Sequence, residues 1–461
     1  MTRSTRSGDS SQRPEEAQAT SVSENGGVTA RATVIVPVLT RQPRAASDDS
    51  RPRISRSPQA RLDEAIGLAG AIDLETVYAE IVTVAEPRPA TLIGTGKLDE
   101  LADIVREREI ELVFIDHPLT PVQQRNLEKT LDAKVLDRTG IILEIFGRRA
   151  RTREGALQVE LAHLEYQRGR LVRSWTHLER QRGGAGFLGG PGETQIEADR
   201  RALQDKIVKL KRELETVRRT RDLHRAKRRK VPYPIVAIVG YTNAGKSTLF
   251  NRMTGAGVLA EDMLFATLDP TLRRVRLPHG TTVILSDTVG FISDLPTHLV
   301  AAFRATLEEV VEADLVIHLR DISDPDTAAQ AEDVAHILRD LGVDAKDERR
   351  VIEVWNKVDL LDEVDRERMR GASAKPPVAI SAATGEGIDR LAALVEQRIA
   401  GTLATVTVKL SPEQAGEVDW LYSNGEVLAR RDHADGGVDL NIRVTEAVRR
   451  EIGARYKKAK E

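Results

Sequence analysis

A glycine-rich loop between an apolar strand and a helix places the strongest constraint on this fold. The apolar run Ile235-Val236-Ala237-Ile238-Val239 leads into Gly240-Tyr241-Thr242-Asn243-Ala244-Gly245-Lys246-Ser247. This is a complete G-x-x-x-x-G-K-S pattern, and residues 248–253 continue with helical character. Such a loop turns its backbone N–H groups towards phosphate oxygens at a helix N-terminus. The order of strand, loop and helix therefore predicts a phosphate-binding loop in an α/β domain.

The end of this loop and a second motif carry the expected phosphate and metal contacts. Lys246 can neutralise the β- and γ-phosphates, and the Ser247 hydroxyl can bind Mg²⁺, a hard cation that prefers oxygen ligands. A second apolar strand leads into Asp287-Thr288-Val289-Gly290. Asp287 suits a water-mediated contact with Mg²⁺, and the Gly290 N–H suits the γ-phosphate. Mg²⁺ is therefore the expected cofactor.

Two later motifs favour guanine over adenine. Asn356-Lys357-Val358-Asp359 follows an apolar run at 351–355, and Ser381-Ala382-Ala383 follows a run at 378–380. The Asp359 carboxylate can accept hydrogen bonds from N1–H and the 2-amino group of guanine, which adenine lacks. With adenine the buried carboxylate would stay unsatisfied, at a cost of several kcal/mol. The Ser381 motif can direct a backbone N–H at guanine O6, so GTP is the expected substrate.

The segment between the first two motifs is expected to change with the nucleotide. It contains Phe265-Ala266-Thr267-Leu268-Asp269. A switch loop needs a threonine that reaches Mg²⁺ only while the γ-phosphate is present. We assign this role to Thr267, which with Ser247 forms the predicted pair of metal ligands, and we keep Thr271 as the alternative.

The catalytic residue cannot be assigned from the sequence. Phe291 follows Gly290 where small signalling GTPases have glutamine. A phenyl ring cannot orient the attacking water by hydrogen bonding, so the protein alone should hydrolyse GTP slowly. Catalysis in such sites is positioning and charge stabilisation, and the missing group can come from a partner or from a rearranged loop. For Phe291 itself we favour packing over a hydrophobic gate.

A basic block precedes the nucleotide motifs. Residues 148–230 contain 23 Lys and Arg against 11 Asp and Glu, a local net charge of +12 in a chain of net charge −2. Apolar residues recur at heptad spacing in 151–182 and 194–230, which predicts an antiparallel helical hairpin. Its tip, 183–192, has six glycines around Phe187 and Leu188. The charge favours a polyanion partner, whereas the tip is equally consistent with a nucleic-acid contact and a simple turn.

The remaining segments predict a five-part chain. Residues 1–60 are rich in Ser, Arg and Pro and are expected to be a disordered extension, with 34–39 as a short strand at a sheet edge. Residues 61–150 alternate strand and helix patterns, typical of a small α/β domain, in which Asp116-His117 is interpreted as a turn. The hairpin covers 151–231, the nucleotide domain 232–400, and a small α+β domain 401–461.

Composition excludes several classes of protein. The chain of 461 residues has no cysteine, which rules out disulfides and thiolate metal sites and fits a reducing compartment. No apolar run approaches the roughly 18 residues of a membrane helix, and the N-terminus lacks a secretory apolar region. We therefore expect a cytoplasmic monomer without stable membrane insertion.

The motifs together resemble those of the translation-factor-related GTPases, and the whole chain is similar to HflX-type GTPases. The resemblance covers residues 62–461. It depends on the nucleotide motifs already quoted, and above all on Gly189-Gly190-Pro191-Gly192-Glu193-Thr194-Gln195 before the basic helix. It implies binding of GTP and GDP, binding to the large ribosomal subunit and its RNA with the hairpin tip near the peptidyl-transferase region, and splitting of stalled or stressed ribosomes. ATP hydrolysis, attributed to some members, is not favoured by Asp359.

Three rival functions remain. The first is a GTPase that serves ribosome assembly or RNA modification, although the sequence shows no second catalytic constellation. The second is an RNA-binding scaffold that uses nucleotide only as a ligand. The third is a lipid-binding surface, which the hairpin does not favour because its heptads bury the apolar faces in each other.

Overall fold

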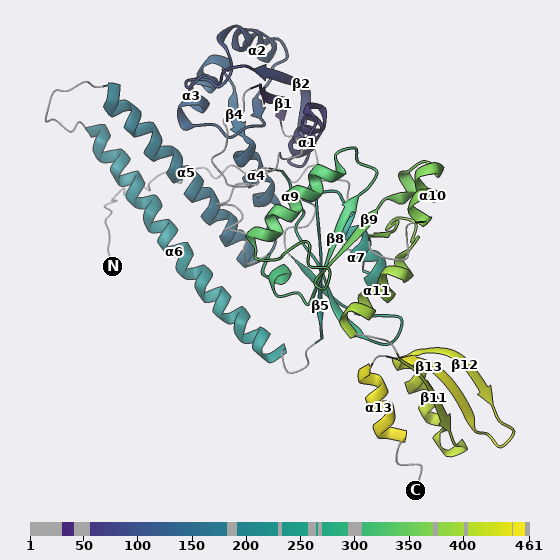
Figure 1. The fold of residues 1–461 in the computed structure, drawn as a ribbon. Coiled ribbons are helices and arrows are strands. Elements are labelled where there is room, and N and C mark those ends of the chain that lie inside the picture. The colour runs from purple at the N-terminus through teal and green to yellow at the C-terminus, as the bar shows by residue number, and fades with distance from the viewer. Residues whose placement is uncertain are drawn as a thin grey trace, which may run out of the picture.

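The computed structural model describes residues 30–40, 56–181, 191–228, 233–256, 264–265, 270–293, 307–371, 377–400, 404–444 and 446–456. These residues form two α/β domains, a long helical hairpin and a small α+β domain (Figure 1). The predicted fold class, a GTPase-type α/β domain between a smaller α/β domain with a helical hairpin and a C-terminal α+β domain, is confirmed.

The N-terminal domain is a parallel four-stranded sheet in the order β2-β1-β3-β4. Its strands are β1 (Ala30–Leu39), β2 (Leu74–Val84), β3 (Leu112–Ile115) and β4 (Lys134–Asp137). Its helices are α1 (Pro58–Gly70), α2 (Thr95–Glu107), α3 (Pro121–Leu131) and α4 (Arg138–Arg149). Helix α3 begins where the sequence supplies both start signals, a proline in the first turn and a reciprocal capping box between Thr120 and Gln123.

The first strand corrects two expectations. Residues 34–39 were expected at a sheet edge, but β1 lies between β2 and β3, with Val34, Ile35 and Val36 fully buried. The expectation of disorder in 1–60 is likewise wrong for residues 30–33, which belong to the same strand, and for 58–60, which begin α1. A parallel strand covered on both faces is a continuous apolar run, and the Ser- and Arg-rich surroundings hid its central position.

The helical hairpin, called the arm below, consists of α5 (Arg153–Gln181) and α6 (Pro191–Arg228). The two helices run side by side (Figure 1). Leu157, Leu210 and Leu214 form their buried core. Partly buried residues pack around this core at Leu161, Leu164 and Val217. The heptad prediction is confirmed for this part, while the predicted seam side chains from 171 to 196 and most of the glycine-rich tip lie outside the described residues.

The nucleotide domain has a six-stranded sheet in the order β10-β9-β8-β5-β7-β6, parallel except for the β6–β7 pair. Its strands are β5 (Ile235–Gly240), β6 (Thr271–Arg276), β7 (Thr282–Asp287), β8 (Leu315–Asp321), β9 (Val351–Asn356) and β10 (Val378–Ala379). Its helices are α7 (Lys246–Thr254), α9 (Thr327–Asp340), α10 (Glu363–Gly371) and α11 (Ile388–Ala400), with the 3-10 turn η1 (Val358–Leu360). Central strand β5 is apolar on both faces because helices and the N-terminal domain cover it.

The C-terminal domain has the predicted β-α-β-β-α order. Its antiparallel sheet, β11-β13-β12, consists of β11 (Ala404–Leu410), β12 (Glu426–Asp432) and β13 (Val438–Val444). The 3-10 turn η2 (Pro412–Glu417) and helices α12 (Val418–Asn424) and α13 (Glu446–Tyr456) complete it. The β6–β7 turn touches this domain, since a Cβ on Gly280 would lie 2.5 Å from the carbonyl carbon of Asn424.

Across the described parts of the chain, we find no helix that combines the length and the apolar character needed to cross a membrane.

Candidate nucleotide site

The phosphate-binding loop lies between the end of β5 and the start of α7, where a parallel sheet commonly binds its ligand. Asn243 and Gly245 have positive φ angles of 60° and 90°, which curve the backbone around a small concave surface. A Cβ on Gly245 would lie 2.3 Å from Asn356 Nδ2, and one on Gly240 would lie 2.2 Å from the Leu319 carbonyl oxygen. Both glycines are therefore required by close packing, and Gly245 also by its positive φ angle.

Lys246 is buried at the first position of α7. Its Nζ donates a hydrogen bond of 2.6 Å to the Tyr241 carbonyl. Burial lowers the pKa of this ammonium group to about 8, an effect that nearby Asp287 only partly offsets. The amine therefore lacks a full counter-charge in this structure, and phosphate oxygens would supply one.

Ser247 and Asp287 place two oxygen donors where they could hold Mg²⁺. The Ser247 hydroxyl lies 2.8 Å from Asp287 Oδ2, and the Asp287 side chain is fully buried at the end of β7. These are hard oxygen donors beside the phosphate-binding loop. In the described ranges, no group of three or more His, Cys, Asp or Glu residues could hold a metal ion. Mg²⁺ needs only a few protein ligands at a phosphate site, because water molecules and phosphate oxygens supply the others.

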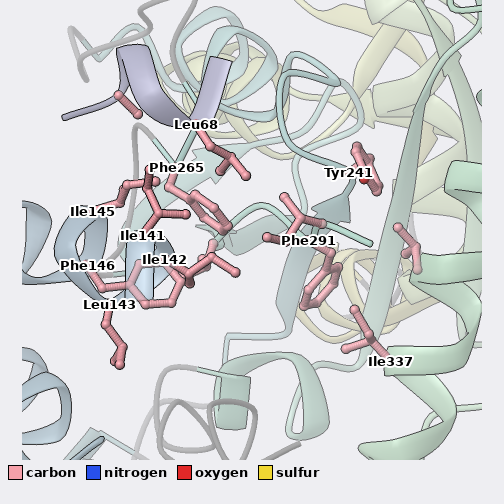
Figure 2. Close-up of a cluster of buried hydrophobic side chains, with 14 of the residues drawn as sticks. Leu68, Ile141, Ile142, Leu143, Ile145, Phe146, Tyr241, Phe265, Phe291 and Ile337 are labelled. Carbon is pink, nitrogen blue, oxygen red and sulfur yellow. The ribbon is translucent and has the colours of Figure 1, made fainter. Parts of the chain in front are cut away.

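The residues after Asp287 lie directly against the phosphate-binding loop. A Cβ on Gly290 would come within 3.0 Å of Lys246 Nζ. Thr242 N donates to the Phe291 carbonyl at 2.7 Å, and Phe291 N donates to the Gly240 carbonyl at 3.1 Å. The Phe291 side chain is 1% exposed and belongs to an apolar cluster (Figure 2). It is placed for packing and has no polar atom to offer a water molecule.

On the base side, Asn356 connects two of the predicted motifs. Its Nδ2 donates to the Ala244 carbonyl at 2.8 Å, and its Oδ1 accepts from Ala382 N at 2.9 Å. Among the residues that the structure describes, Asp359 Oδ1 is buried and has no hydrogen-bond partner. A buried carboxylate oxygen without a donor is costly, so the N–H groups of a ligand would satisfy it.

The Ser381 motif is held by its neighbours. Ser381 N donates to the Glu386 carbonyl at 2.9 Å, and Ser381 Oγ accepts from Thr384 N at 3.0 Å. Arg252 of α7 donates to the carbonyls of Ala382 and Ala383. These contacts fix the loop beside Asn356 and thereby connect it to the phosphate-binding helix.

Several other predicted residues make contacts within the protein. Phe265 is buried against Phe146 of α4, with ring centroids 4.8 Å apart (Figure 2). Val289 and Val358 are buried apolar residues, and the Thr288 hydroxyl donates to the Ile238 carbonyl at 2.6 Å. Lys357 Nζ pairs with Asp321 at 2.7 Å. Ala266, Thr267, Leu268 and Asp269 lie outside the described residues, and the alternative ligand Thr271 begins β6 opposite Asp287.

Sequence analysis missed a group of charged residues beside the site. Arg56, Glu64, Asp116 and Arg138, called the buried charge cluster below, form ion pairs with one another. Asp116, interpreted from sequence as part of a turn, is 1% exposed at the end of β3. The cluster reaches Tyr241 of the phosphate-binding loop. These residues come from segments far apart in the chain, and no local spacing pattern could have revealed them.

A phosphate-binding loop, an Asp-x-x-Gly segment and an Asn-Lys-x-Asp segment at the ends of parallel strands define a P-loop GTPase. Four family models match the chain: a GTP-binding GTPase N-terminal region at 59–147, a GTP-binding GTPase middle region at 149–228, a 50S ribosome-binding GTPase at 235–357, and an HflX C-terminal domain at 368–461.

Curated relatives agree with these matches. The GTPase HflX of Magnetococcus marinus is 49% identical over 388 residues, covering 83% of this chain and 88% of the relative. The GTPase HflX of Escherichia coli is 44% identical over 384 residues, covering 83% and 89%. The chain therefore belongs to the HflX family of GTPases and is a GTP hydrolase.

Among solved structures, a GTP-binding protein from the archaeon Sulfolobus solfataricus, in complex with GDP, is 23% identical to this chain. The match covers 80% of this chain and 98% of that one, with a TM-score of 0.41.

Proposed function

We propose that this GTPase binds the large ribosomal subunit through its arm while GTP is bound, and that it splits or rescues stalled or stressed ribosomes. Hydrolysis then releases it. Support comes from the family, one of whose matching models is described as a 50S ribosome-binding GTPase, and from the charge on the arm.

The exposed basic face of α6 is the observation that carries the proposal. Three of its apolar residues, Ile207, Leu210 and Leu214, are buried, whereas Val208 is exposed. Its exposed basic residues include Arg200, Arg201, Lys206, Lys209, Lys211, Arg212 and Arg219. This surface presents positive charge to a partner rich in phosphate, and Val208 is the single large apolar side chain exposed on the described part of α6. RNA binding through it should weaken steeply as salt concentration rises.

The nucleotide site is proposed to work as follows. Lys246 binds the β- and γ-phosphates, and Ser247 binds Mg²⁺, with Asp287 acting through a water molecule. Thr267 would be a further Mg²⁺ ligand while the γ-phosphate is present. Mg²⁺ supplies charge neutralisation during phosphoryl transfer.

The base-side roles rest on an orphaned atom. Asp359 binds guanine N1–H and the 2-amino group, which would satisfy its buried Oδ1. The same pairing disfavours ATP as a substrate. Because Phe291 cannot orient water, we propose that GTP hydrolysis is slow without ribosomes and is stimulated by them.

Sedimentation of ribosomes with full-length protein tests this proposal. We expect co-sedimentation with the large subunit in the presence of a non-hydrolysable GTP analogue, and loss of binding with GDP. The double substitution Lys206→Glu and Lys209→Glu should weaken ribosome binding and make the remaining affinity depend less steeply on salt concentration. The pair Lys346→Glu and Arg349→Glu makes the same charge change on an exposed part of the nucleotide domain and should leave binding intact.

Two further measurements separate the rival functions. Deletion of 183–192 should preserve GTP affinity but abolish the effect on ribosomes. Multiple-turnover phosphate release should rise when ribosomes are added. Equal release with and without ribosomes would favour the RNA-binding scaffold, and binding only to precursor subunits would favour a role in assembly.

A further inference from the structure

Two consecutive residues at the end of β4 contact two different parts of the molecule. Arg138 reaches the segment that follows Gly290, whereas Asp137 reaches helix α5 of the arm. We call residues 137–138 the junction, and residues 290–293 the switch segment.

On one side, the Arg138 guanidinium donates to the switch segment. Its Nη2 lies 2.9 Å from both the carbonyl oxygen and the Oγ of Ser293, and 2.5 Å from Glu64 Oε1. Its Nη1 pairs with Asp116. The side chain is 4% exposed, so these contacts form in a low-dielectric environment, where paired charges are strongly oriented.

The N-terminal domain also contacts the switch segment through Glu64, whose Oε1 accepts a hydrogen bond from Ser293 Oγ at 3.2 Å. The Tyr241 hydroxyl accepts from Ser293 N at 2.8 Å and donates to Glu64. Arg56 Nη1 donates to the same hydroxyl at 2.8 Å. Burial would raise the pKa of Glu64, but Arg138 and Arg56 outweigh it and bring the pKa to about 2. Glu64 therefore remains charged at physiological pH and keeps these contacts.

On the other side, the Asp137 carboxylate holds the arm. It accepts from the Tyr166 hydroxyl at 2.6 Å and from Arg170 Nη2 at 2.9 Å, both on α5. It also accepts from Gly140 N at 2.8 Å, which caps α4, and from Leu119 N at 3.2 Å. The Arg170 guanidinium stacks on the Tyr166 ring at 4.0 Å from its centroid. The middle of α5 is thus bound to the residue adjacent to Arg138.

The switch segment lies directly against the phosphate-binding loop. Gly290 lies over Lys246, and the Thr242 N–H is used by Phe291. A triphosphate bound to Lys246 would bring its γ-phosphate against Gly290, so we expect the position of the switch segment to change with the nucleotide. Displacement of Ser293 must either break its contacts with Arg138 or carry Arg138 with it.

We infer that the junction transmits the position of the switch segment to the arm, and that Arg138 is a positioning residue for the nucleotide-dependent angle of the arm. This inference rests on the proposed function, in which nucleotide controls the arm. Arg138 and Asp137 share one peptide unit, and both side chains are buried and paired. A shift of one must therefore alter the other, because close-packed polar groups have few alternative arrangements.

Distance measurements between two spin labels test the inference in the full-length protein. The chain has no cysteine, so Asp205→Cys on α6 and Lys346→Cys in the nucleotide domain give one pair of labels at exposed sites. The protein is loaded with GDP or with a non-hydrolysable GTP analogue. We expect the label distance to differ between the two states, and Arg138→Met to abolish that difference.

The matched control is Arg61→Met. Arg61 Nη2 binds the carboxylate and the carbonyl oxygen of Asp116, both at 3.2 Å, and belongs to the same charged region, but among the described residues it does not bond to the switch segment. Its removal should leave the nucleotide-dependent distance change intact. Arg138→Met is expected to fold, because Glu64 retains Arg56 and Asp116 retains Arg61 as partners.

A variant at the arm side protects the test against misfolding of Arg138→Met. Arg170→Met keeps the buried charge cluster whole but removes one contact of Asp137 with α5. It should reduce the distance change while GDP affinity stays within about twofold of wild type. By thermodynamic reciprocity, Arg138→Met should also change the ratio of GTP-analogue to GDP affinity by about fivefold or more.

Two outcomes would overturn the inference: a distance that is the same with both nucleotides in the wild-type chain, or a distance change that survives in both Arg138→Met and Arg170→Met. Neither readout uses ribosomes. A wild-type chain that shows the distance change but does not bind ribosomes would refute the proposed function and leave the junction standing.

Discussion

The two parallel sheets use the same edge for different purposes. In the nucleotide domain, the C-terminal ends of β5, β7 and β9 place Gly240, Asp287 and Asn356 around a phosphate-binding loop. In the N-terminal domain, the ends of β3 and β4 place Asp116 and Asp137 at the equivalent edge. There the carboxylates bind arginine and tyrosine side chains of the same chain.

The difference lies in what the polar groups already bind. Asp137 accepts four hydrogen bonds from the protein, whereas Asp359 Oδ1 has no donor in the described residues. A strand-end carboxylate that is fully paired within the chain holds parts of the protein together. One that is buried and unpaired is ready to bind a ligand. The position of a carboxylate in the fold therefore does not identify a binding site until its partners are known.

The largest expected effect is on GTP affinity, when one lysine from each of the two domains, Lys246 or Lys97, is replaced by methionine. Lys246→Met should weaken GTP binding by about 4 kcal/mol, near a thousandfold in Kd, because the phosphates lose a buried cation. Lys97 lies in the first turn of α2, which follows a strand of the N-terminal sheet, but it pairs with Glu80 and Glu100, both at 2.7 Å. Isothermal titration with GTP should show no change for Lys97→Met. Equal losses in the two variants would place nucleotide at both sheets.

A smaller but still large effect concerns stability. Asp137→Ala should lower the free energy of unfolding by about 3 kcal/mol, because it leaves Arg170 and Tyr166 without their buried acceptor. Denaturant unfolding measures this change. Asp103→Ala, which removes an exposed partner of Arg106, should change stability by less than about 0.5 kcal/mol. If Asp137→Ala were as harmless, the paired carboxylates of this sheet would not be structural.

The two sheets also differ in how far the sequence predicts them. The motifs around Lys246 and Asp359 are local, and each follows an apolar strand, so both the nucleotide domain and its site could be predicted. The contact between Glu64 and Tyr241 joins residues 177 positions apart. In a sequence, a charged residue with such a distant partner looks like one exposed to solvent. Strand β1 was misplaced for a related reason, since its neighbours in the sheet come later in the chain.

Base specificity gives the next effect in size. Asp359→Asn should weaken GTP binding roughly a hundredfold, because an amide cannot accept both guanine N–H groups as the carboxylate does. Xanthosine triphosphate has a carbonyl oxygen where guanine has its 2-amino group. The amide introduced at position 359 could donate a hydrogen bond to that oxygen, so the affinity for xanthosine triphosphate should rise in this variant. Competition between the two nucleotides for a fluorescent analogue measures the exchange. Unchanged GTP affinity would show that the unpaired oxygen serves a purpose other than binding guanine.

The smallest expected effect is on the pH dependence of the free energy of unfolding, to which Lys246 and Lys97 contribute with opposite signs. Burial lowers the pKa of Lys246 to about 8. At Lys97, burial also acts to lower the pKa, but Glu100 and Glu80 outweigh it, and the pKa is raised. Between about pH 8 and the ordinary lysine range, unfolded chains bind more protons at residue 246 than folded chains do. Without nucleotide, Lys246 therefore makes stability rise through this window.

GTP binding should follow the opposite course in the same window. The triphosphate requires a charged Lys246, so affinity should be nearly constant below pH 8 and then fall by up to about tenfold per pH unit. Titration calorimetry at pH 7 to about pH 10 measures the slope, and the wild-type profile should persist in Lys97→Met because that lysine touches no nucleotide. A flat profile through pH 9 would mean that the Lys246 ammonium keeps its proton without the phosphates. The carbonyl of Tyr241 and the carboxylate of Asp287 would then stabilise its charge within the free protein, and the contrast between an unsatisfied nucleotide site and a satisfied structural edge would apply to Asp359 alone.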